Sequence, residues 1–163
     1  DALGFLPDMG MFLKKFPPVW KARFIRNGVP EKIADYIEKA YEDRVLSEYV
    51  IQNVREMGGT GPSIAMAETL RHNAAYEPNR MLAHMSRIHN IHGKFYEMTP
   101  ELVEPSIPYD EIIAVLKQGG YDGYICSEYE GNRWIEDVQD VDSVTQVSRQ
   151  QQMLTNLIEK AEA

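Results

Sequence analysis

The stretch from residue 106 to residue 125, SIPYDEIIAVLKQGGYDGYI, constrains the fold more than any other part of the sequence. Asp110 and Glu111 stand where the first turn of a helix favours negative charge. Apolar residues then recur at helical spacing, and Gly119 stops the pattern just before a second apolar run. With another apolar run upstream, the stretch predicts a strand, a helix and a strand, and such a crossover implies parallel strands.

Three short apolar runs are typical of buried parallel strands, because each begins apolar and ends in polar residues. They cover residues 2–8, 87–97 and 121–131. The long segment between the first two runs is expected to be helical throughout, and a last helix is expected to begin at Asp142 or Ser143. About residues 12–86 are therefore more than a simple crossover between strands.

Composition excludes several classes of protein. The chain has 163 residues and is 44% hydrophobic, which suffices for one globular domain. Its 17 basic and 25 acidic residues give a net charge of −8, whereas nucleic-acid binding needs clustered Lys and Arg. The sequence contains no apolar run of membrane-spanning length and no signal-peptide pattern.

Two further features bear on location and completeness. The single cysteine, Cys126, cannot form an internal disulfide, which favours the cytoplasm. In an apolar strand we expect Cys126 to be a small core residue rather than a nucleophile. The sequence begins at Asp1, almost directly on an apolar run, so we expect it to be part of a longer protein.

The ends of the three runs supply a candidate metal site. Side chains alternate along a strand, so His92 and Lys94 share one face of the second run, as Cys126 and Glu128 do on the third. If the strands are parallel neighbours, one imidazole and two carboxylates converge at their carboxyl ends: Asp8, His92 and Glu128. Such ligands favour manganese, magnesium or cobalt over a structural zinc. Each residue alone also has an ordinary explanation, as a half-buried, solvated or turn residue.

Three motifs resemble the xylose-isomerase-like sugar phosphate isomerase/epimerase family of TIM barrels. GYDGYICSEYEG, with IPYDEIIAVLKQG before it, resembles the family's last strand, which ends in a metal-binding Glu. IHGKF is similar to the strand before that, in which a metal-binding His precedes a Lys by two. LGFLPDMGMF resembles the strand before that one, which ends in a metal-binding Asp. The resemblance implies that residues 1–163 are the C-terminal portion, the last three strands, of a single α/β TIM (β/α)8 barrel, with about residues 12–86 as an enlarged helical insertion.

The same resemblance implies a divalent-metal-dependent sugar isomerase or epimerase that transfers a proton next to a carbonyl. Mn²⁺ is the first choice of ion, with Mg²⁺ or Co²⁺ as alternatives. Asp8, His92 and Glu128 would bind it, and Glu128 would also take and return the proton. Lys94 would bind a substrate oxygen or phosphate, unless it is simply an exposed lysine at a strand end. Met11 departs from the family, which often has a second His there, and a thioether suits hard cations poorly.

Two other functions remain open. The same metal and base would serve a lyase, either a dehydratase or an enzyme that cleaves carbon–glycoside bonds. Alternatively, the chain is a non-catalytic barrel fragment whose helical segment mediates assembly. Three strands cannot close a barrel, so their open edges predict a partner: the missing N-terminal half, a second subunit or a second copy in a homo-oligomer. The expected ligand is a sugar or sugar-like small molecule, with no membrane or nucleic-acid partner.

Overall fold

The computed structural model describes residues 3–72 and 76–162, which divide into two compact units. The first unit takes its residues from Asp1–Leu13 and Ala75–Ala163, and the second is Lys14–Ala74. The helical segment expected at about residues 12–86 thus contains the whole second unit. Its last residues, from Ala75 onwards, belong to the first unit.

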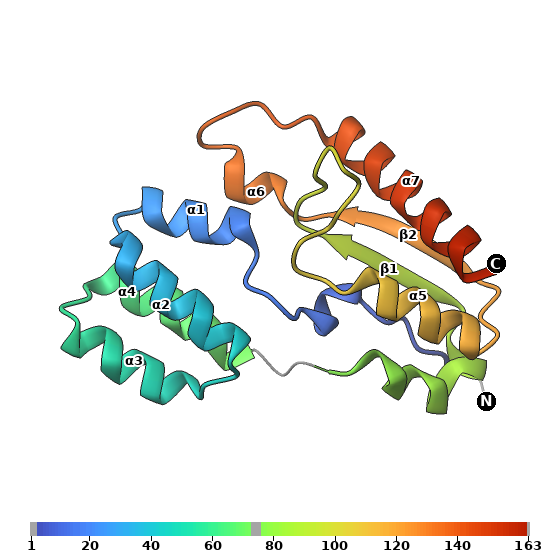
Figure 1. Ribbon diagram of the computed structural model, residues 1–163, viewed down its shortest axis with the longest axis horizontal. Coiled ribbons are helices and arrows are strands. Elements are labelled where there is room, and N and C mark those ends of the chain that lie inside the picture. Colours follow the sequence, from blue (N-terminus) through green and yellow to red (C-terminus); the bar gives the residue numbers. More distant parts are fainter. Residues whose placement is uncertain (1–2, 73–75, 163) are drawn as a thin grey trace. The chain divides into compact units, whose positions relative to one another are not determined.

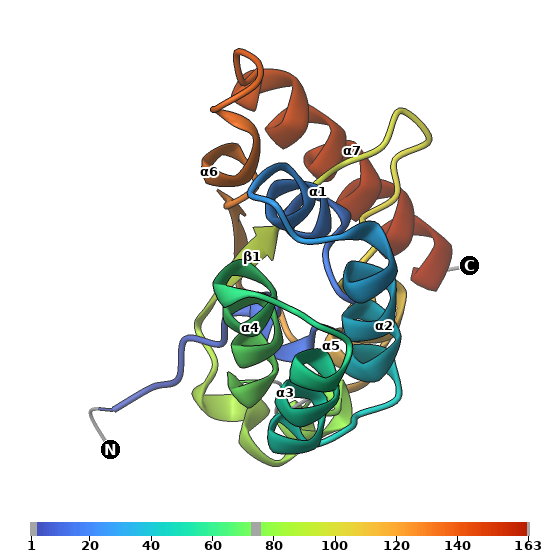
Figure 2. The ribbon, with the colours of Figure 1, turned by 90° about the vertical axis from the view of Figure 1, so that its left-hand side faces the viewer.

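The second unit is entirely helical in its described residues. Its elements are α1 (Pro18–Arg26), α2 (Glu31–Glu42), α3 (Ser47–Glu56), α4 (Gly61–Glu68) and the short 3-10 helix η2 (Thr69–His72). Helix α4 packs against both α2 and α3 (Figure 2). Lys21 joins α1 to α2 through ion pairs of 2.6 Å with Asp35 and with Glu38. Apolar residues of one face of each helix form the core between them, as the helical spacing predicts.

The first unit contains the predicted strand–helix–strand arrangement (Figure 1). Strands β1 (Asn90–Phe95) and β2 (Tyr124–Tyr129) are parallel, and α5 (Tyr109–Gln118) connects them. Around them lie the 3-10 helices η1 (Met9–Phe12) and η3 (Pro78–Arg87), and the α-helices α6 (Asn132–Ile135) and α7 (Ser143–Glu162). Asp142 caps α7, as predicted, by accepting a hydrogen bond of 2.9 Å from the Thr145 N–H. None of the helices in the described ranges combines the length and hydrophobicity that crossing a membrane requires.

Helices α5 and α7 cover one face of β1, and a buried network of hydrogen bonds joins them to the strand. The Gln150 side-chain amide donates to the Gly93 carbonyl at 2.7 Å and to the Tyr109 hydroxyl at 3.0 Å. The Tyr109 hydroxyl in turn donates to the Lys94 carbonyl at 2.7 Å. A Cβ atom at Gly93 would lie 2.8 Å from Ile125 Cγ2 and 3.3 Å from Gln150 Nε2. Glycine is therefore what lets α7 approach the strand, and the opposite face of β1 is left to polar side chains.

The expected strand over residues 2–8 does not form, and the predicted three-stranded portion of a TIM barrel is wrong. Within the described residues the sheet consists of β1 and β2 alone, in a chain that is otherwise mainly helical. Phe5 and Asp8 make only isolated parallel bridges, to Ile88 and His92. Asp8 follows Phe5 by three residues whereas His92 follows Ile88 by four, so the pairing slips out of register. Pro7, between the bridges, also has no N–H to donate to a ladder.

The loop after β1 is held by a buried carboxyl group. Glu104 is only 6% exposed and accepts hydrogen bonds from the backbone N–H groups of Tyr96 at 3.4 Å, Ser106 at 2.7 Å and Ile107 at 2.5 Å. Burial raises the pKa of Glu104 to about 7, although these N–H groups work to lower it. In the folded protein this group therefore takes up a proton near neutral pH.

We expect the free energy of unfolding to fall as the pH rises from about 4.5 to about 7, because folded Glu104 still holds a proton that the unfolded chain has released. A shift of this size corresponds to about 3 kcal/mol. Urea unfolding at several pH values should show the decline in the unmodified chain and in the control Glu101→Gln, whose residue is exposed. The decline should flatten in Glu104→Gln, and parallel curves for the two variants would contradict the assignment.

Candidate metal centre

Asp8, His92 and Glu128 come together on the open face of the two strands. Each offers one ligand atom, and these atoms lie within 4.8 Å of one another. Metal–ligand bonds of about 2.0–2.6 Å allow one ion to touch atoms separated by about 4–5 Å. The three side chains are 38%, 42% and 34% exposed, so the cluster is open to solvent.

The register of the sheet places two of these residues on one face. Lys94 pairs with Glu128, and His92 pairs with Cys126. Paired residues of parallel strands project to the same side, so all four lie opposite the face that α5 and α7 cover. This confirms the predicted alternation along β1, in which Ile91, Gly93 and Phe95 are buried and the residues between them are half-buried.

Asp8 reaches the cluster by a different route. The His92 N–H donates to the Pro7 carbonyl at 2.9 Å, which fixes the end of the N-terminal segment beside β1. The Asp8 carboxylate then caps η1 by accepting a hydrogen bond of 2.7 Å from the Gly10 N–H. A Cβ atom on Gly10 would lie 2.8 Å from Lys94 Cδ and 3.0 Å from Asp8 Oδ1. The glycine thus makes room for the lysine and the carboxylate to meet.

Lys94 lies between the two carboxylates. Its ammonium nitrogen is 2.6 Å from Asp8 Oδ2 and 3.6 Å from Glu128 Oε1, and its side chain is 19% exposed. Burial works to lower the pKa of Lys94, but the surrounding negative charges, above all Asp8, outweigh this effect and raise it. The lysine is therefore a fixed cation that partly neutralises the cluster, and a metal ion would share the same carboxylates with it.

One carboxylate oxygen of the cluster lacks a donor, which suits a cation. Glu128 Oε2 is buried and accepts no hydrogen bond within the described part of the chain. It lies 3.3 Å from Nδ1 of His92, the other half of an imidazole–carboxylate pair. Two carboxylates and an imidazole are a donor set that manganese and related divalent ions accept. The residues present therefore fit a divalent cation.

Cys126 differs from what the sequence led us to expect. Cys126 is exposed rather than a core residue, and its thiol donates to Asn90 Oδ1 at 3.3 Å. The reason is that Cys126 shares the open face of the sheet with Glu128, away from the helices. Met11, at the position where the resembled family often has a second His, is 41% exposed and lines a neighbouring apolar cavity. The Asp8–Lys94 ion pair and the role of Gly10 were not foreseen, because both depend on segments distant in sequence.

Comparison with known proteins gives three informative relatives, although no protein-family model matches the chain. The chain is 30% identical over 147 residues to the 3'-dehydrocarminate deglycosidase alpha subunit of Microbacterium sp, covering 81% of this chain and 42% of that protein. It is 24% identical over 169 residues to a C-glycoside deglycosidase alpha subunit of Arthrobacter globiformis, covering 99% of this chain and 47% of that protein. A similar subunit of Microbacterium trichothecenolyticum is 43% identical over 47 residues, 29% of this chain and 13% of that protein. The chain spans less than half the length of these curated relatives.

We expect the chain to bind one Mn²⁺ ion in a calorimetric titration. Asp8→Asn and His92→Ala should each weaken binding by about tenfold or more, because the first removes a negative charge from an oxygen ligand and the second removes a nitrogen ligand. Lys94→Met should tighten binding, since its ammonium group competes with the ion for the same carboxylates. The control is Glu130→Gln, because Glu130 pairs with Arg133 outside the cluster. Equal losses in the control and in Asp8→Asn would rule out a site at these residues.

Proposed function

We propose that the chain is part of a divalent-metal-dependent enzyme that cleaves carbon–glycoside bonds. The observation that carries this proposal is the convergence of Asp8, His92 and Glu128 beside the Lys94 ammonium group. The same four residues would suit a sugar isomerase or epimerase, which the motifs first suggested. The relatives instead carry the names of deglycosidase subunits, so they support the lyase alternative and lend no support to isomerisation.

In this proposal Glu128 is the catalytic base. Its Oε2 atom accepts no hydrogen bond from any described residue, and a carboxylate that binds a metal ion can also take and return a proton. A 3'-dehydro sugar, the kind of substrate in the name of the Microbacterium sp relative, carries a carbonyl that acidifies the neighbouring C–H bond. Glu128 removes that proton, the C–H electron pair forms a carbon–carbon double bond, and the bond to the aglycone breaks. The electron pair of the broken bond leaves with the aglycone, which accepts a proton.

Lys94 and the other cluster residues bind and orient the substrate. The ammonium group of Lys94 stays protonated beside Asp8, so it can hold the carbonyl oxygen as negative charge develops there. Asp8 and His92, with Glu128, would hold the divalent ion, which when bound supplies a Lewis acid for the substrate oxygens. The hydrogen bond that the Gly10 N–H of η1 donates to Asp8 keeps the carboxylate in place for this purpose.

A second polypeptide is part of the proposal, because the relatives are named as alpha subunits. The activity is therefore expected of the whole assembled enzyme. A purely structural role for the chain, without catalysis, is the second candidate. It would be favoured if the chain bound no divalent ion.

Glu128→Gln should lower the rate of aglycone release by about a hundredfold to ten-thousandfold, because an amide cannot accept the proton. The assay uses the complete protein with Mn²⁺, an aryl C-glycoside bearing a 3'-carbonyl, and chromatography of the free aglycone. Glu130→Gln is the matched control, two residues further along the chain and paired with Arg133 instead. Interconversion of ketoses without release of an aglycone would contradict the proposal and restore the isomerase hypothesis.

A further inference from the structure

A free backbone edge lies along residues 4–8, on the side away from β1. Phe5 donates its N–H to the Arg87 carbonyl at 2.8 Å, and the Pro7 carbonyl accepts from the His92 N–H at 2.9 Å. Leu6, between them, forms no backbone hydrogen bond with any described residue. Successive residues of an extended segment direct these groups to opposite sides, so the N–H and C=O of Leu6 are open to another strand.

Large apolar side chains surround this edge. Leu3 is 77% exposed, Leu6 is 53% exposed and Phe5 is 45% exposed. Met11 and Tyr76, which lie beside them in the same unit, are 41% and 39% exposed. Exposed apolar residues that gather around an unpaired edge are typical of an interaction site rather than of an ordinary surface.

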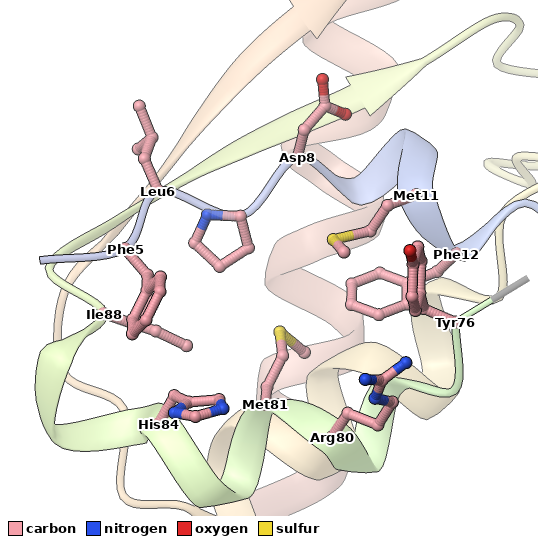
Figure 3. A pocket seen from close by; sticks show the side chains of 11 residues that line it. Phe5, Leu6, Asp8, Met11, Phe12, Tyr76, Arg80, Met81, His84 and Ile88 are labelled. Atoms are coloured by element: carbon pink, nitrogen blue, oxygen red, sulfur yellow. The ribbon is translucent and has the colours of Figure 1, made fainter. Parts of the chain in front are cut away.

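A cavity of about 440 Å³ opens on one face of the segment. Figure 3 shows that Phe5, Met81 and His84 line it, whereas the carboxylate of Asp8 points away. A molecule in the cavity would therefore not meet the ion that Asp8 is proposed to bind. The cavity is of a size to accept an aromatic or branched side chain from a partner.

One arginine lines this apolar cavity, and another lies beside it. The Arg80 guanidinium stacks on the Tyr76 ring at 4.9 Å, and the Arg87 guanidinium lies over the Phe5 ring at 4.9 Å. The His84 ring centroid is 5.1 Å from that of Phe5. In a chain with a net charge of −8, the two guanidinium groups favour a partner segment that carries a carboxylate.

We propose that residues 4–8 and the cavity bind an extended, apolar segment that carries a carboxylate and pairs with the backbone of Leu6 as an added strand. The matches to this chain cover only 42% and 47% of two of the relatives. We assign the bound segment to a polypeptide that corresponds to the remaining, unmatched part of those relatives. The proposal goes beyond the proposed function and does not rest on it, because the Asp8 carboxylate points away from the cavity.

The test uses the part of the Microbacterium sp protein outside the matched residues, produced as a separate polypeptide and mixed with the isotope-labelled chain. Light scattering should show a one-to-one complex, and nuclear magnetic resonance should show that the Leu6 amide becomes protected from hydrogen exchange. Absence of a complex, or a complex in which Leu6 exchanges as before, would overturn the proposal. Self-association of the chain that protects Leu6 would overturn it too, because the occupant would then be a second copy.

Two variants isolate the backbone and the charge contributions. Leu6→Pro removes a single N–H that the fold does not use, and should weaken the complex by about tenfold or more. Its control is Val144→Lys, at a residue of α7 that is 81% exposed. Arg80→Glu should also weaken the complex by about tenfold at low salt, whereas Arg55→Glu, an equal charge change in the second unit, should not.

Circular dichroism must show that each variant is folded. If Leu6→Pro does not fold, the affinity of Arg80→Glu and the hydrogen exchange of the Leu6 amide in the unmodified chain still test the proposal. Affinities unchanged in both variants would overturn the proposal. The free chain should bind Mn²⁺ with the same affinity whether it is unmodified or carries Arg80→Glu. Failure of the metal site and failure of the docking surface can therefore be told apart.

Discussion

The parallel pairing of β1 with β2 is the constraint on which the candidate site depends. It sets Lys94 opposite Glu128 and His92 opposite Cys126, so imidazole, ammonium and carboxylate share one face. A slip of one residue in either strand would turn that strand's polar side chains towards the helices and separate the cluster. The bridge from Asp8 to His92 then adds the second carboxylate without a third strand.

The buried face of β1 is what keeps this register. Gln150 and Tyr109 bond to carbonyl oxygens of Gly93 and Lys94, and Gly93 lacks the side chain that would push α7 away. Residues of β1 that hold the apolar core thus alternate with residues that carry charge. The cluster has a rigid support on one side and solvent on the other, a favourable arrangement for binding a polar small molecule.

The sequence predicted those elements whose formation depends on residues close together in the chain. The helical spacing after Asp110 and the glycine stop predicted the crossover, and the side chain of Asp142 predicted the start of α7. The expected closeness of Asp8, His92 and Glu128 is also observed, although His92 lies in the first half of β1 rather than at its end. The sequence did not reveal the slip in register at Pro7, which leaves two strands where three were expected. Nor did it reveal that Lys94 pairs with Asp8, since that contact joins two segments that are far apart in the sequence.

The central claim is that Asp8, His92 and Glu128 bind one divalent ion. Pulsed electron paramagnetic resonance of the Mn²⁺-loaded chain tests it most directly, because a directly bound imidazole nitrogen couples magnetically to the metal. We expect a nitrogen coupling in the unmodified chain that persists in His84→Gln, at an exposed histidine outside the cluster, and disappears in His92→Gln. Bound Mn²⁺ without nitrogen coupling, or a coupling that survives in His92→Gln, would contradict it.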